Sequence, residues 1–181
     1  MTDVQIAALA GCAVLIFWSV GAYNRLIALR DNIAKAFAPV DAQVQHRHEL
    51  LMQWAHGLHA VLDQAPPLYE AVLTACAQLQ LACDGLRARP GTGSAATSLR
   101  LAEETLTAAR QRLQAELPAR QQRLSGLELK VHSEQLGAAD NTLAFARSQF
   151  NAATKTYNDA IRQFPTRLVA STFGFRAAGT L

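Results

Sequence analysis

Charged residues are scarce in this sequence, and aromatic residues are scarcer still. Asp, Glu, Lys and Arg make up 17% of the chain, against about 25% in typical soluble domains. Aromatic residues make up 7%, while alanine, leucine and glutamine are abundant, which favours helices over sheets. The net charge is +3, and no run of Lys and Arg is interleaved with aromatic residues. The sequence therefore gives no support for nucleic-acid binding.

Cysteine is also rare, with only Cys12, Cys76 and Cys83 in the chain. Cys76 and Cys83 are seven residues apart, which on one helix is about 10 Å along the axis, too far for a disulfide. No disulfide framework is predicted, which is consistent with a reducing compartment. The 181 residues, 50% of them hydrophobic, suit one domain with a core of its own.

The scarcity of charge is greatest near the N-terminus, where residues 6–23 contain no charged side chain. A helix needs about 20 mostly apolar residues to span the hydrocarbon of a bilayer. We therefore predict one transmembrane helix over residues 1–23, continuous because backbone groups in lipid must bond internally. Trp18 and Tyr23 lie near its C-terminal end, where amphipathic rings favour the membrane–water interface.

Basic residues set the predicted orientation. Arg25, Arg30 and Lys35 follow the apolar segment, and only Asp3 precedes it. The positive-inside rule then predicts a single-pass protein of the bacterial inner (cytoplasmic) membrane, with its N-terminus outside and its body in the cytoplasm.

A lipoprotein signal is the alternative for this segment, because residues 9–12 (Leu-Ala-Gly-Cys) match a cleavage box that would lipidate Cys12. No Lys or Arg precedes the box, whereas signal peptides begin with a basic region. The apolar run also continues well beyond Cys12, so the transmembrane helix is favoured and lipidation stays open.

Beyond Tyr23, apolar residues recur every three or four positions, which predicts long amphipathic helices. The first continues from the membrane segment to about residue 63, with a kink expected at Pro39. Pro66-Pro67 begin the second, a loop is predicted over residues 87–96, and Thr97 or Ser98 caps the third. A fourth helix is predicted over residues 121–164, with Gly137 expected to loosen its middle.

These segments predict an all-α fold, in which an N-terminal transmembrane helix continues into a long antiparallel bundle of about four helices. The bundle covers residues 24–165, and a C-terminal tail covers residues 166–181.

Three stretches of the sequence form distinctive motifs: residues 23–27 (Tyr-Asn-Arg-Leu-Ile), residues 47–50 (Arg-His-Glu-Leu) and, most specifically, the block from Asp140 to Phe175. They resemble motifs of the LemA family of bacterial membrane proteins. Met52-Gln53 stand where the family usually has Pro-Asn, and residues 87–118 match poorly. The resemblance implies a membrane anchor, a helical bundle and no established catalysis. One branch of the family helps to build magnetosome membranes, and others are linked to membrane stress or membrane proteases.

Catalytic and metal-binding patterns are incomplete. His48-Glu49 begins a zinc-protease motif, but Met52 stands where the second histidine is required. His56 and His59 are three residues apart, without the carboxylates or cysteines that complete a zinc site. We therefore expect exposed helical histidines, no enzyme activity, no metal, no cofactor and no small-molecule substrate.

Polar and aromatic residues of the family block are the candidates for fixing register or assembly between helices or subunits. The alternative is a solvent-exposed face. Arg147 is expected to pair with an acid on the first long helix, such as Asp41 or Glu49. The candidate set is Asn141, Arg147, Phe150, Asn151, Tyr157, Asn158, Phe164 and Pro165.

The tail has two interpretations of its own. Phe173 and Phe175 could lie on the membrane, with Arg167 and Arg176 at anionic head groups, or the aromatic rings could close the end of the bundle. The first interpretation gives Trp18, Tyr23, Phe173, Phe175 and Arg176 as membrane contacts.

The favoured function is that of a membrane-anchored assembly protein, which self-associates through its bundle and organises or remodels the membrane. Its expected partners are the lipid bilayer and further copies of the chain, with no nucleic acid. Polar substitution of Leu143, Phe150 or Tyr157 is expected to abolish assembly. The alternative is an adaptor that binds another membrane protein, such as a protease or a sensor.

Overall fold

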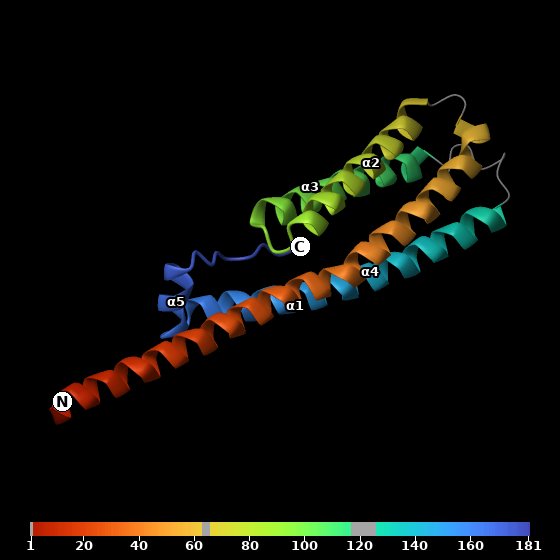
Figure 1. The fold of residues 1–181 in the computed structure, drawn as a ribbon. Coiled ribbons are helices and arrows are strands. Elements are labelled where there is room, and N and C mark those ends of the chain that lie inside the picture. The colour runs from red at the N-terminus through yellow and green to blue at the C-terminus, as the bar shows by residue number, and fades with distance from the viewer. Residues whose placement is uncertain (1, 63–65, 117–125) are drawn as a thin grey trace.

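The computed structural model describes residues 2–62, 66–116 and 126–181, with side chains for residues 2–55, 67–116 and 131–181. In these ranges the chain forms five helices and no strand, which confirms the all-α prediction. The helices are α1 (Asp3–Leu62), α2 (Pro66–Ala88), α3 (Gly93–Glu116), α4 (Gly126–Arg162) and α5 (Thr166–Thr172). Figure 1 shows α1 beside α4, the α2·α3 hairpin against this pair, and α5 near the N-terminal part of α1.

Helix α1 is continuous over 60 residues, a length of about 90 Å. It does not end at Pro39, and the buried stripe keeps its phase on both sides of the proline, through Ile33, Phe37, Val40 and Val44. Helical spacing of apolar residues thus holds α1 against the bundle over its second half.

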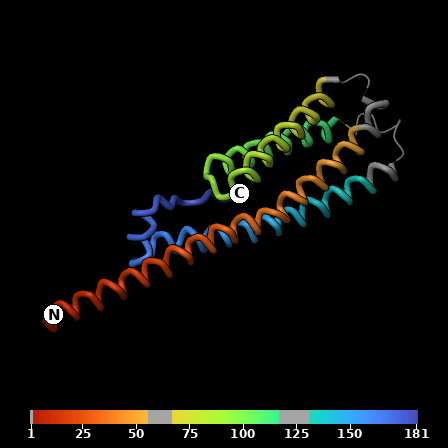
Figure 2. The backbone as a smooth tube through the Cα atoms, viewed as in Figure 1, coloured from red at the N-terminus to blue at the C-terminus, as the bar shows by residue number. Residues whose placement is uncertain are grey.

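The first part of α1 projects beyond the bundle (Figure 2). Its apolar side chains, among them Val14, Ile16 and Phe17, are exposed, and burial begins at Ala22 and Leu26. In the described part of the chain, this is the helix long and apolar enough to cross a membrane, and none of its most apolar window is buried. Among the described residues, none covers this apolar window of α1.

The core lies between the α1·α4 pair and the α2·α3 hairpin. Phe150 of α4 is fully buried and meets Phe37 of α1 edge-on, with ring centroids 6.1 Å apart. A smaller apolar cluster joins α1, α4 and α5, and it consists of Ala22, Leu26, Ala160, Val169 and Ala170. This second cluster fixes α5 beside the first buried turns of α1.

The connection between α2 and α3 is shorter than predicted. The expected loop over residues 87–96 is a turn between Ala88 and Gly93, because Gly91 adopts a positive φ of 83° that closes it tightly. The expected caps Thr97 and Ser98 lie inside α3, where their hydroxyls donate to the carbonyls of Gly93 and Ser94. The prediction that Thr97 or Ser98 caps this helix was therefore wrong.

Helix α4 ends at Arg162, close to the predicted stop, and continues through Gly137. The predicted start near Gln121 lies outside the described residues. After α5 the chain has no regular secondary structure and returns toward the α2–α3 turn, as the dark blue trace in Figure 1 shows. The tail is therefore part of the folded structure.

Candidate functional site

A partly buried network of ion pairs connects α1, α3 and α4 through five side chains. Arg47 of α1 donates to Glu103 of α3 at 2.6 Å and to Asp140 of α4 at 3.2 Å. Glu103 lies 2.8 Å from Arg147, and Asp140 accepts from Arg110 at 3.1 Å. The side chains of Arg47 and Glu103 are only 6% and 8% exposed. The network fixes the relative register of three helices.

Arg47 remains charged in this position. Burial, the largest single effect, lowers the pKa of Arg47, but Glu103 and Asp140 raise it, and the net pKa is above the ordinary value. A buried charge of this kind depends on its partners, because removing one of them leaves a charge without solvent or counterion.

The partner expected for Arg147 was wrong. Arg147 pairs with Glu103 on α3, and Asp41 of α1 pairs instead with Arg87 of α2 at 2.6 Å. The Arg147 side chain reaches the α2·α3 hairpin, whose position follows only from the tertiary arrangement.

The C-terminal tail is held by three side chains of α4, which we call the tail clasp: Asn151, Tyr157 and Asn158. The Asn158 amide donates to the Ala178 carbonyl at 2.9 Å and accepts from the Ala178 N–H at 2.8 Å. Asn151 makes the same pair of bonds with Leu181, at 2.7 and 2.8 Å. A carboxamide has the donor and acceptor of a peptide group, so each asparagine pairs with the tail as a neighbouring strand would.

Two further contacts fix the course of the tail. The Tyr157 hydroxyl donates to the Arg176 carbonyl at 2.9 Å. Gly179 passes so close to α3 that a Cβ there would lie 2.8 Å from both Gly93 and Ala96. The tail therefore bridges α4 and the start of α3.

The structure separates the other assembly candidates. Phe150 is fully buried in the core, Asn141 is exposed, and Phe164 is 82% exposed. Pro165, which follows Phe164 through a cis peptide bond, precedes α5. These residues thus share no common surface.

The candidate membrane residues gather where α1 leaves the bundle. Tyr23 meets Phe173 and Phe175, with ring centroids 5.0 and 5.7 Å apart, and Trp18 is half-buried against the cluster around Leu26. Phe175 is also half-buried, whereas Phe173 is 60% exposed. Phe175 closes the end of the bundle, and Phe173 continues outward from it.

Two hollows adjoin this aromatic group. One, of about 500 Å³, lies between α1, the α2–α3 turn and the tail, and its lining includes Arg30, Tyr157 and Arg176. The other, of about 400 Å³, lies against the exposed part of α1 and is lined by Leu15, Ile16, Ser19, Val20, Tyr23 and Phe173.

The described histidines differ in exposure, and two of the three cysteines are buried. His46 is exposed and His48 half-buried, and the side chains of His56 and His59 lie outside the described residues. Within the described ranges, no three residues of the types His, Cys, Asp and Glu gather to hold a metal. Burial raises the pKa of Cys83 to about 12 and that of Cys76 above its ordinary value, so both thiols stay protonated and poorly nucleophilic at neutral pH.

The fold defines a class of protein: a helical bundle that continues from a helix apolar enough to span a membrane. The sequence matches the LemA family over residues 36–181, so the chain belongs to that family. Among proteins with curated functions, none matches this chain.

Proposed function

We propose that this LemA-family protein is a membrane-anchored assembly protein, whose copies associate through their bundles and thereby organise or remodel the membrane. The observation that carries the proposal is a set of large apolar side chains exposed on the bundle. Leu81 of α2 and Leu101 of α3 are 72% and 53% exposed and line one hollow of about 470 Å³. Phe145 of α4 is 65% exposed.

Single exposed apolar residues are common on soluble proteins, but two leucines from different helices beside one shallow hollow offer a surface on which an apolar side chain can pack. Burying one leucine or phenylalanine stabilises an interface by about 1.5–3 kcal/mol. The hollow and Phe145 are different surfaces, so Phe145 of one copy packing into the hollow of the next makes a head-to-tail contact. Such a contact repeats from copy to copy.

Helix α1 connects this assembly to the membrane. It runs without a break from the exposed apolar segment into the core, so the direction of the anchor is fixed relative to the bundle. A row of bundles then imposes its spacing and tilt on a row of anchors. This rigid connection supports a role in membrane organisation, and the role we propose is structural rather than catalytic.

The proposed location is the bacterial inner membrane, with the bundle in the cytoplasm. Arg25, Arg30 and Lys35 support it through the positive-inside rule. The exposed substitution Gln114→Cys on α3 is expected to resist a membrane-impermeant thiol reagent in intact spheroplasts and to react after permeabilisation. Labelling in intact spheroplasts would reverse the topology.

The size of the full-length protein in mild detergent tests the assembly. Light scattering and negative-stain images are expected to show large, uniform particles for the natural sequence. Leu81→Glu with Leu101→Glu, or Phe145→Glu alone, is expected to reduce them to small species, because each places charge in the proposed contact. Gln114→Glu adds charge at an exposed position of α3 outside the hollow and is expected to leave particle size unchanged.

Circular dichroism of each variant is expected to show that the helices remain. Polar substitutions of Leu143, Phe150 or Tyr157 would instead disturb folding, because all three side chains are buried inside the protomer. Unchanged particles in both charged variants would remove the basis of the proposal. A monomer or dimer of the natural sequence would favour the adaptor alternative, in which the same exposed surfaces bind another membrane protein.

A further inference from the structure

Two hollows of opposite character meet at one pair of aromatic rings. The apolar hollow, about 400 Å³, lies against the segment of α1 that is apolar enough to span a membrane. The polar hollow, about 500 Å³, lies next to it on the side of the bundle. Tyr23 and Phe173 line both, and their rings are 5.0 Å apart.

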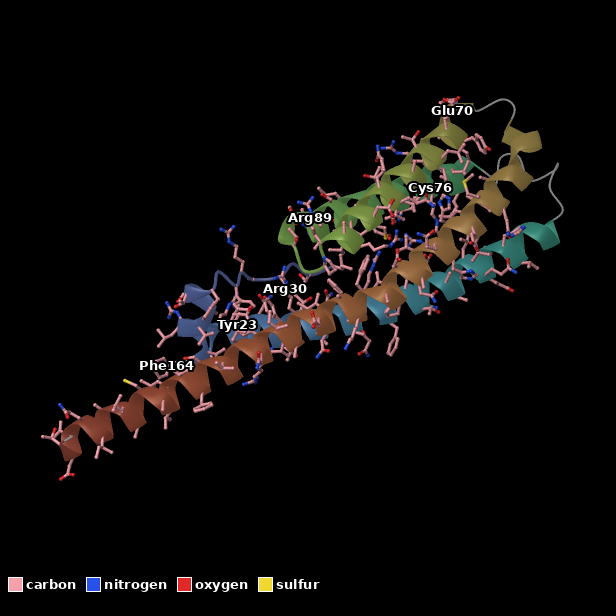
Figure 3. The ribbon with its side chains drawn as sticks, in the orientation of Figure 1. Tyr23, Arg30, Glu70, Cys76, Arg89 and Phe164 are labelled. Atoms are coloured by element: carbon pink, nitrogen blue, oxygen red, sulfur yellow. The ribbon has the colours of Figure 1, made fainter. Side chains whose placement is uncertain are left out.

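One face of α1 connects the two hollows. Ile16, Val20, Tyr23, Ile27 and Arg30 follow one another at steps of three or four residues and line one hollow or the other. The distance from Ile16 to Arg30 along the helix axis is about 21 Å, which is close to the thickness of one leaflet of a phospholipid bilayer. Figure 3 shows Tyr23 and Arg30 on the side of α1 that faces the tail.

The polar hollow carries positive charge without a counterion. Its lining contains Arg30 and Arg176 and no acidic residue. Neither guanidinium has an ion pair within the described parts of the chain, and the two arginines line the same hollow. Guanidinium groups bind phosphate through paired hydrogen bonds.

The tail clasp holds Arg176 at this hollow. The Arg176 carbonyl accepts from Tyr157, and Asn158 binds Ala178 two residues further on. The backbone is therefore fixed while the Arg176 side chain stays exposed. This arrangement places one cation on α1 and one on the tail around the same space.

We infer that the two hollows together bind one anionic phospholipid of the surrounding bilayer. Its acyl chain lies against Ile16 and Val20, its glycerol region lies beside Tyr23 and Phe173, and its phosphate lies between Arg30 and Arg176. The inference rests on the proposed membrane anchor, because the apolar hollow meets lipid only if the first part of α1 is in the bilayer. The boundary position of Tyr23 agrees with the preference of tyrosine for the membrane interface.

Full-length protein in nanodiscs of equal phosphatidylglycerol and phosphatidylcholine provides the test. After release from the discs, native mass spectrometry measures which lipid stays bound. The natural sequence is expected to retain one phosphatidylglycerol in preference to phosphatidylcholine. Arg30→Gln with Arg176→Gln is expected to lower that preference about 30-fold, from the usual contribution of each basic side chain near a charged membrane.

Arg112→Gln with Arg162→Gln is the matched control, because it removes the same charge from exposed positions outside both hollows. It is expected to leave the preference unchanged. Val20→Trp fills the apolar hollow without changing charge and is expected to reduce retention of both lipids. An equal loss in the two double variants would overturn the site in favour of a diffuse surface charge.

Flotation of the same proteins with vesicles separates this inference from the proposed anchor. If the natural sequence floats with vesicles of phosphatidylcholine alone but shows no preference for phosphatidylglycerol in the nanodiscs, the lipid site fails and the anchor stands. If it floats neither with vesicles of phosphatidylcholine alone nor with vesicles that also contain phosphatidylglycerol, the anchor fails, and the lipid site fails with it.

Discussion

Glu103→Leu removes a nearly buried carboxylate that two arginines share. Arg47 lies 2.6 Å from one of its oxygens and Arg147 2.8 Å from the other. After the substitution, the 6%-exposed Arg47 side chain keeps only Asp140, at 3.2 Å. Breaking a buried pair costs about 3–5 kcal/mol, and because Asp140 remains we expect the lower end, about 3 kcal/mol.

Thermal unfolding of the full-length protein in mild detergent, followed by circular dichroism, measures this loss. For a chain of this size, about 1 kcal/mol corresponds to about 2–4 °C, so Tm is expected to fall by about 6–12 °C. Arg87→Ala at the pair with Asp41 is the comparison, because Arg87 is 47% exposed. Exposed pairs contribute about 0–1 kcal/mol.

The double variant Arg47→Met with Glu103→Leu removes both charges of the pair at once. Apolar residues of similar volume often replace a buried ion pair with little loss, so the double variant is expected to be more stable than Glu103→Leu alone. If Glu103→Leu lowers Tm no more than Arg87→Ala does, the network contributes nothing special and the reasoning is refuted.

Two further predictions concern the tail and the buried thiol. Asn158→Ala removes both bonds to Ala178 and is expected to accelerate exchange of the Ala178 amide about 10-fold or more, since each bond contributes about 1 kcal/mol, and to expose the Arg176 bond to trypsin. Asn141→Ala, an exposed position of the same helix, is the control, and equal protection in both variants would contradict the clasp. The second prediction concerns Cys83, whose pKa is raised to about 12. Burial, the largest cause, favours the protonated thiol in the folded state, so this contribution to stability is complete below about pH 9, the ordinary value, and is lost as the pH rises toward 12. Cys83→Ala is expected to make the free energy of unfolding fall less steeply between about pH 9 and pH 12. A slope equal to that of the natural sequence would refute this prediction.

Several features followed from local sequence patterns. The stripe through Leu26, Ile33 and Val40 predicted α1 because a period of 3.6 residues places those side chains on one face, and all three are fully buried. The uncharged segment before Tyr23 predicted the exposed apolar helix, and Pro66 marked the start of α2. Each of these depends only on residues close together in the chain.

Other features depended on residues far apart in the sequence. Asn151 and Asn158 were recognised as candidates, but their partners lie 30 and 20 residues away in the tail, and nothing in the residue types specifies that pairing. Glu103 was missed altogether, although an acid within the buried stripe of α3 was a signal that could have found it. Long-range hydrogen bonds and ion pairs are set by how helices dock.

The sequence by itself determined that this chain is helical, that it has an apolar N-terminal helix and that it resembles the LemA family, because periodicity and composition are properties of neighbouring residues. The tertiary structure alone decided that Arg147 meets Glu103, that the tail returns along α4, and that Arg30 and Arg176 share one hollow. Those contacts join residues that lie from 20 positions apart (Asn158 and Ala178) to 146 positions apart (Arg30 and Arg176), so they exist only once the helices pack.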